Sequence, residues 1–112
     1  MSGAYTVVTD ATFAQEVLNS ADPVIVDFWA PWCQPCLRMA PTFEALAQEF
    51  QGKIRFAKMN TDENGLTPGR FNIQGIPTMI IFRGGKEVDR IVGLVNRDTL
   101  KRHLEAALGA VA

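Results

Sequence analysis

The two cysteines of this 112-residue chain, Cys33 and Cys36, are its only ones, and they follow closely on the apolar run 24–30. This run predicts a buried β-strand, because its apolar character is nearly continuous. If a helix begins at the cysteines, positions i and i+3 share one face, with Cβ atoms roughly 5–6 Å apart. A disulfide needs about 3.5–4.5 Å between these atoms, so a small local adjustment closes it. The spacing therefore predicts a reversible dithiol/disulfide pair at the carboxyl edge of a sheet, where open α/β folds place their chemistry.

Three other roles for the cysteine pair are open on the residues alone. As a structural staple, a four-residue loop would restrain the unfolded chain by only about 2 kcal/mol, against roughly 3 kcal/mol for fifteen residues. Structural zinc usually has four Cys or His ligands, and the chain adds only His103 to the two thiols, so a metal would have to be shared across a dimer. Two inert core thiols fit poorly with Trp32 and Pro35, which suit an exposed turn. The redox role is favoured over all three, and we expect no bound metal.

Charge and hydropathy argue against several classes of partner. The formal net charge is −1 and the isoelectric point is about 5.7, so we expect neither nucleic acid nor an anionic membrane as a partner. No apolar stretch approaches the roughly 20 residues of a membrane span, and residues 1–5 do not resemble the start of a secretory signal. We therefore expect a cytoplasmic protein, in which a lone cysteine pair is more often catalytic than structural.

Strand and helix signals alternate along the chain. Strands are predicted at 5–8, 24–30, 54–59, 78–82 and 88–92, and helices at about 10–19, 33–50 and 96–109, with a short broken helix within 62–71. Gly84-Gly85 between the last two strands is typical of a hairpin turn, and Thr9 or Asp10 is expected to cap the first helix. The chain shows no linker or repeat, so we predict one α/β domain over residues 1–112 in the order βαβαβαββα.

Three segments carry a family resemblance. Residues 26–36 contain Trp-Cys-Gln-Pro-Cys, residues 57–62 read Ala-Lys-Met-Asn-Thr-Asp, and residues 75–78 read Gly-Ile-Pro-Thr. Together they resemble the thioredoxin family, and the element order matches it from about residue 5 to residue 108. The resemblance implies a thioredoxin fold, with a central mixed five-stranded sheet flanked by four helices. It also implies a protein-disulfide reductase without a bound cofactor, which acts on disulfide-containing client proteins, and we expect the protein to be a monomer. Its electrons would come from NADPH through a flavin-containing thioredoxin reductase.

The position of the cysteines and the resemblance together predict their roles. Cys33, at a helix N-terminus, would be favoured as a thiolate by unpaired N–H groups and by the helix dipole, so it is the expected nucleophile. Cys36 would then resolve the mixed disulfide between Cys33 and a substrate cysteine. Pro35 suits the first helical turn, where its missing N–H has no intrahelical partner. Gln34 stands where the family most often has glycine, and we expect these two intervening residues to tune the reduction potential.

Asp27 is a carboxylate inside the apolar run, where burial would raise its pKa towards neutrality. The alternative is an outward-facing, solvated strand residue. By similarity to the family, Asp27 would lie below Cys36 and accept its proton. Lys58 resembles the lysine that pairs with this aspartate in the family, and its alternative is an exposed strand lysine.

A docking surface is the last expectation. The resemblance implies a cis bond between Ile76 and Pro77, with Pro77 against the cysteines and the Ile76 backbone free to pair with an extended client segment. The alternative is an ordinary loop proline. Trp32, Ile76, Pro77 and Gly93 would form an apolar face around Cys33. Two rival functions are a disulfide oxidase or isomerase on the same fold, and a non-catalytic binding module that uses this face.

Overall fold

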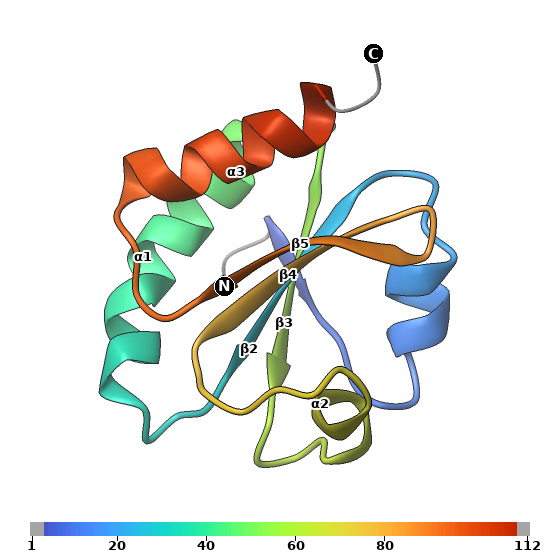
Figure 1. The fold of residues 1–112 in the computed structure, drawn as a ribbon, viewed down its shortest axis with the longest axis vertical. Helices are drawn as coiled ribbons and strands as arrows, with labels where there is room; N and C mark the ends of the chain where they lie inside the picture. The colour runs from blue at the N-terminus through green and yellow to red at the C-terminus, as the bar shows by residue number, and fades with distance from the viewer. Residues whose placement is uncertain (1–3, 110–112) are drawn as a thin grey trace.

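The computed structural model describes residues 4–109, and Figure 1 shows the path of the chain. The elements in chain order are β1 (Tyr5–Val7), η1 (Ala14–Leu18), β2 (Val24–Trp29), α1 (Gln34–Glu49), β3 (Arg55–Asn60), α2 (Leu66–Arg70), β4 (Thr78–Arg83), β5 (Lys86–Val92) and α3 (Arg97–Gly109). The predicted order βαβαβαββα is confirmed. The strands and the two long helices begin and end within two residues of the predicted positions.

The first helical segment is shorter than the predicted range 10–19. Turns occupy residues 10–12, and η1 is a single π-helical turn in which the Asn19 N–H donates to the Ala14 carbonyl at 2.9 Å. Thr9 closes the preceding turn, because its hydroxyl accepts from the Thr12 N–H at 3.2 Å. Asp10, the other expected cap, instead accepts from two backbone N–H groups at the start of α2. Asp10 therefore makes a long-range contact with α2 instead of capping the helical segment next to it in the sequence.

The five strands form one mixed sheet in the order β1-β3-β2-β4-β5. The strands β1, β3 and β2 are parallel, whereas β4 is antiparallel to β2 and β5 is antiparallel to β4. The β4–β5 hairpin turns at Gly84 and Gly85, whose φ angles of 59° and 80° lie in the left-handed region that favours glycine. β2 is the central strand, and Cys33 lies just beyond its carboxyl end.

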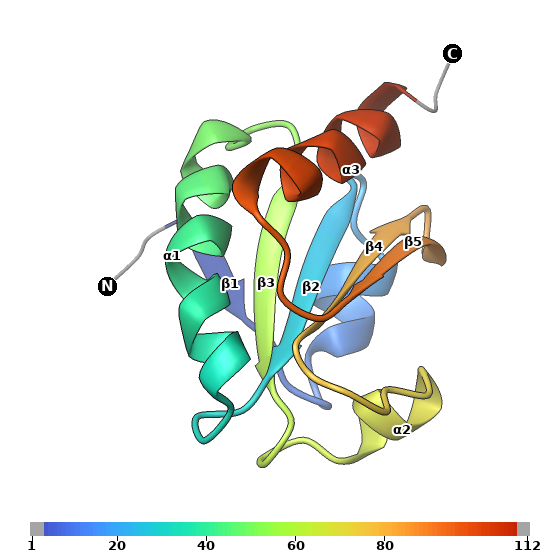
Figure 2. The same ribbon diagram turned by 60° about the vertical axis from the view of Figure 1, so that its left-hand side comes forward.

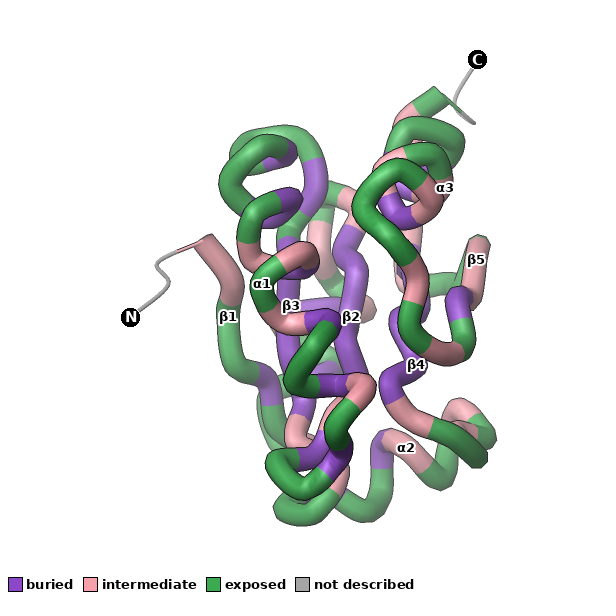
Figure 3. The backbone as a smooth tube through the Cα atoms, turned by 90° about the vertical axis from the view of Figure 1, so that its left-hand side faces the viewer, coloured by how far each residue is buried: buried purple, intermediate pink, exposed green. Residues whose placement is uncertain are grey.

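Helical segments cover both faces of this sheet (Figure 2). The helices α1 and α3 lie over one face, where Phe43 and Leu104 pack in a core with Ile25 of β2. On the other face, Phe13 beside η1 packs in a second core with Val26 of β2. In Figure 3 the central strands are largely buried, whereas the edge strands β1 and β5 carry more exposed residues. No helix within residues 4–109 is long and apolar enough to cross a membrane.

The alternation of side chains along β2 and β3 decides where their charged residues lie. Ile25 and Asp27 are two residues apart on β2, as are Phe56 and Lys58 on β3, so each pair shares a face of the sheet. Ile25 and Phe56 belong to the core under α1 and α3. Asp27 and Lys58 therefore lie on the face that α1 and α3 cover.

Candidate active site

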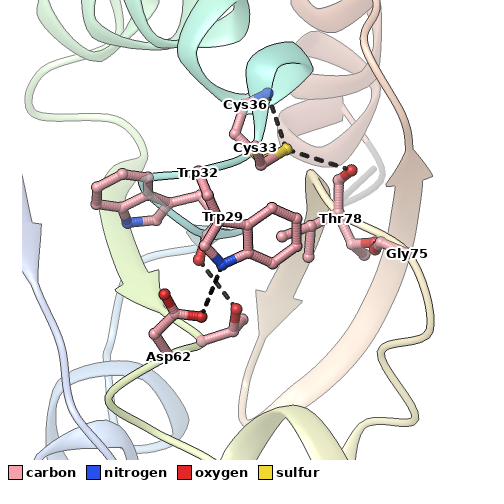
Figure 4. Close-up of a disulfide and its surroundings, with 9 residues drawn as sticks. Trp29, Trp32, Cys33, Cys36, Asp62, Gly75 and Thr78 are labelled. Atoms are coloured by element: carbon pink, nitrogen blue, oxygen red, sulfur yellow. Dashed lines mark hydrogen bonds between the residues drawn. A yellow bond between two sulfur atoms is a disulfide. The ribbon is translucent and has the colours of Figure 1, made fainter.

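Cys33 and Cys36 form a disulfide at the N-terminus of α1, with their Cα atoms 5.2 Å apart (Figure 4). Cys33 is the N-cap rather than the first helical residue, and its backbone is extended at φ −87° and ψ 109°. Its Sγ atom accepts a hydrogen bond from the Cys36 N–H at 3.2 Å. The cysteine pair therefore opens α1, as its spacing predicted, and a sulfur atom takes the place that an oxygen usually has in a helix cap.

The residues between the cysteines begin the helix. Gln34 is exposed at the first helical position, and Pro35 follows it in the first turn, where a proline costs no helical hydrogen bond. Cys33 and Cys36 are both largely covered, with 5% and 2% of their surfaces exposed. Cys33 is flanked in the chain by the exposed residues Trp32 and Gln34.

The segment that precedes β4 lies against the cysteines. The Ile76-Pro77 peptide bond is cis, and Ile76 packs against Ala30, Cys33 and Cys36. The Sγ atom of Cys33 lies 3.7 Å from the Ile76 carbonyl oxygen. The contact brings the backbone of the expected docking segment to the expected nucleophile.

The other expected docking residues differ in exposure. Trp32 has 66% of its surface exposed, whereas Pro77 is buried. The Gly93 N–H donates to the Pro77 carbonyl at 2.8 Å, and Gly93 has a φ of 95°, which favours glycine. Val92 and Leu94 on either side of it are 65% and 44% exposed, and the sequence reasoning did not select them. Their position beside Gly93 was the signal that could have found them.

Asp62 and Thr78 also contribute to the site without having been predicted. The indole Nε1 of Trp32 donates to Asp62 Oδ1 at 3.0 Å, which orients the exposed ring (Figure 4). The buried Thr78 hydroxyl donates to the Gly75 carbonyl at 2.5 Å, and this hydrogen bond stabilises the turn that precedes β4. Asp62 could have been found from topology, because it follows β3, whose carboxyl end lies beside that of β2.

Asp27 is fully buried, and neither of its carboxylate oxygens has a hydrogen-bond partner within residues 4–109. Burial raises its pKa to about 7, and the charge of Lys58 opposes this shift. The solvated alternative for this residue is wrong, since β2 is covered on both faces. A carboxyl group with this pKa exchanges a proton readily near neutral pH.

Lys58 is also buried, which excludes the exposed alternative. It lies directly opposite Asp27 in the β2–β3 register, but its Nζ atom makes its ion pair with Glu44 of α1, at 3.9 Å. The same ammonium lies over the rings of Trp29 and Tyr5, at 4.8 and 5.2 Å from their centroids. Lys58 therefore acts on Asp27 through its electric field rather than through a direct ion pair.

A thioredoxin family model matches residues 4–106 of the chain. The chain belongs to the thioredoxin family. Over 101 residues it is 52% identical to "Thioredoxin 1" of Nostoc sp. and 48% identical to "Thioredoxin" of Synechocystis sp., and each match covers 90% of this chain and 94% of the relative. It is also 45% identical over 109 residues to "Thioredoxin 2" of Chlorobaculum tepidum, which covers 97% of this chain and 100% of the relative.

Family membership and the cysteine geometry agree on the chemistry. The protein is a thiol–disulfide oxidoreductase, a protein-disulfide reductase of the thioredoxin type, and its redox-active group is the Cys33–Cys36 disulfide. The sheet order and helices are those of the thioredoxin fold. In the part of the chain that the structure describes, no three His, Cys, Asp or Glu side chains are grouped to hold a metal ion.

Proposed function

We propose that Cys33 is the attacking thiol of this thioredoxin and that Cys36 is the resolving thiol. The Cys33 thiolate attacks one sulfur of a client disulfide, forms a mixed disulfide and releases the other client sulfur as a thiolate. Cys36 then attacks Cys33, so the client leaves with two thiols and the cysteine pair is oxidised. The observation that carries this assignment is the place of Cys33 as N-cap of α1, with the Cys36 N–H on its sulfur.

We further propose that Asp27 accepts the proton of Cys36 during resolution. Its carboxyl group lies on the face of the sheet that α1 covers, Cys36 is one of the buried residues of α1, and the carboxyl group has no competing hydrogen bond within the described chain. A pKa of about 7 lets it take up and release a proton at the pH at which the reaction runs. Lys58 limits how far burial raises that pKa.

Clients are proposed to dock across the face that Trp32, Ile76 and Gly93 form together with the buried Pro77 beneath them. The Ile76 backbone lies beside Cys33, so an extended client segment that pairs with it would bring its disulfide to the sulfur. The exposed apolar side chains of Val92 and Leu94 enlarge this face. Gln34 and Pro35 are proposed to set the reduction potential, since they lie between the two cysteines at the start of α1.

We propose that a flavin-containing thioredoxin reductase returns the cysteine pair to its dithiol form with electrons from NADPH. This follows from the family rather than from a site on the chain, and no cofactor needs to be bound. We also propose that the protein is a monomer in the cytoplasm. Both cysteines of the chain belong to the redox site, and none is left for a structural disulfide.

The test is the reduction of insulin disulfides, followed as turbidity with dithiothreitol as the recharging thiol. The wild type should accelerate the reaction, Cys33→Ser should not, and Cys36→Ser should accumulate the mixed disulfide. Equal activity of the wild type and Cys33→Ser would reject the assignment. A reduction potential well above about −200 mV would favour the oxidase or isomerase direction, because it approaches the range of disulfide isomerases.

A further inference from the structure

The segment between α2 and β4 carries the docking backbone, and β5 holds it at both ends. At its far end, the Gly93 N–H, just after β5, donates to the Pro77 carbonyl at 2.8 Å. At its near end, the Arg90 guanidinium on β5 donates through Nη2 to the Phe71 carbonyl, also at 2.8 Å. Residues 72–76 span the distance between these two attachments.

Arg90 is held in a fixed orientation for this contact. Its Nε donates to Glu87 Oε2 at 2.7 Å and its Nη2 to Glu87 Oε1 at 2.8 Å, which is a two-pronged pair within β5. The Arg90 side chain is only 29% exposed. The same Nη2 reaches the Phe71 carbonyl, so one planar group joins the strand to the end of α2.

α2 depends on such contacts because it has only five residues, far fewer than an isolated helix needs in water. Asp10 accepts from the N–H groups of Leu66 and Thr67 at its N-terminal end, at 3.2 and 2.8 Å. Phe71 is the C-cap, where helical carbonyls lack intrahelical partners. A carboxylate therefore holds the start of α2, and the Arg90 guanidinium holds its end.

We propose that Arg90 is a positioning residue for client binding, which fixes the end of α2 and thereby the place of the Ile76 backbone beside Cys33. The inference rests on the proposed docking role of Ile76. Without Arg90, the attachment of Pro77 to Gly93 remains and the Phe71 ring still packs with Phe13 and Phe82, but the Phe71 carbonyl loses its fixed donor, so the near end of the segment is held less tightly. Extended clients that pair with the Ile76 backbone then bind more weakly, while the cysteine chemistry is unaffected.

If Arg90 had only a structural role, its replacement would have a different effect. It would lower the stability of the fold and would change the reaction with peptide substrates and with small disulfides to the same extent. Hydroxyethyl disulfide provides this separation, because it has no peptide backbone to pair with Ile76. The reduced protein is mixed with increasing concentrations of insulin or with hydroxyethyl disulfide. The oxidised fraction of the protein is followed by maleimide labelling of its own remaining thiols, which the mass of the labelled protein distinguishes from those of insulin.

For Arg90→Gln we expect the half-saturating insulin concentration to rise about threefold to tenfold, the factor that corresponds to one loosened hydrogen bond. The limiting rate and the rate with hydroxyethyl disulfide should equal those of the wild type. Arg90→Lys keeps a donor group and the positive charge, so its half-saturating insulin concentration should lie between those of the wild type and of Arg90→Gln. Faster amide hydrogen exchange within residues 72–76 should accompany the change.

Arg55→Gln is the matched control. Arg55 also pairs with a glutamate, Glu16, and donates to a backbone carbonyl. However, it is the first residue of β3, at the amino end of the parallel strands, whereas Cys33 lies beyond their carboxyl end. Arg55→Gln should leave both the half-saturating insulin concentration and the rate with hydroxyethyl disulfide at their wild-type values. Should Arg90→Gln fail to fold, Arg90→Lys and Glu87→Gln carry the test, with smaller increases expected.

An unchanged half-saturating insulin concentration in the folded Arg90 variants would overturn the inference, as would an equal loss with both substrates. The proposed function fails in a different way, when oxidation of the wild type by insulin does not require Cys33.

Discussion

Two aspartates of this protein lie in opposite environments. Asp10 reaches across to the start of α2 and accepts two backbone N–H groups, and hydrogen bonding from the Thr67 side chain and from these N–H groups lowers its pKa. Asp27 lies in the middle of the central strand without a hydrogen-bond partner within residues 4–109, and burial raises its pKa to about 7. The first carboxylate stabilises the fold as an anion, whereas the second destabilises it as an anion.

The difference in environment suits the two aspartates to different roles, one structural and one in proton transfer. A satisfied carboxylate such as Asp10 keeps its charge and holds a helix, but it is a poor proton acceptor near neutral pH. An unsatisfied buried carboxyl such as Asp27 costs folding free energy, and in return it can exchange a proton at the pH of the reaction. Asp27 lies on the face of the sheet that α1 covers, and Cys36 is one of the buried residues of α1.

The largest expected effect comes from Asp27→Asn. The folded carboxyl holds its proton up to about pH 7, while the unfolded chain releases it near 3.8, so wild-type stability falls as the pH rises between these values. The difference corresponds to about 4 kcal/mol. The variant should therefore be more stable than the wild type at pH 8, and resolution should slow on the order of a hundredfold.

Urea denaturation at pH 4 and pH 8 measures the stability difference, and trapping of the mixed disulfide measures the resolution rate. A variant that is less stable than the wild type at pH 8 and resolves at the normal rate would contradict the role of Asp27.

A smaller effect is expected from Lys58→Met. The charge of Lys58 lowers the pKa of Asp27, so its removal should raise that pKa above 7. Carbon-13 NMR of the Asp27 carboxyl during a pH titration measures the shift. Lys53→Met, at an exposed position before β3, is the control and should leave the titration unchanged. A titration identical in both variants would show that Lys58 does not act on Asp27.

The smallest effect is expected from Asp10→Ala. Its carboxylate has a lowered pKa in the folded state, so its stabilisation is present above the usual value of 3.8 and is lost as the pH falls through the lower folded value. The variant should melt at a lower temperature than the wild type at pH 7, and the difference should shrink in acid. A constant difference down to pH 2 would mean that the charge of Asp10 is not what holds α2.

The sequence predicted most of the fold because its signals are local. The apolar run of β2, the hairpin glycines and the helical spacing of α1 and α3 each depend on neighbouring residues. The short helix predicted within residues 62–71 is confirmed by α2, whereas the first helical segment was predicted less well. Asp10 looked like a cap for its own segment, but it binds α2 more than fifty positions later. Local pattern cannot show such long-range contacts.

The same limit applies to the site. The position of Cys33 and Cys36 followed from the strand–turn–helix pattern, and the burial of Asp27 followed from the apolar run around it. The contact of Lys58 with Glu44, and that of Trp32 with Asp62, join elements that only the folded sheet brings together. The place of Arg90 against the end of α2 likewise required the structure.

The most direct test of the account is the alkylation rate of Cys33 in the reduced protein as a function of pH, with iodoacetamide and with the modified residue identified by mass spectrometry. We predict a midpoint well below the value of about 8.5 for a free cysteine, with Cys36 reacting far more slowly. A Cys33 midpoint equal to that of free cysteine, or preferential modification of Cys36, would contradict the assignment of the nucleophile.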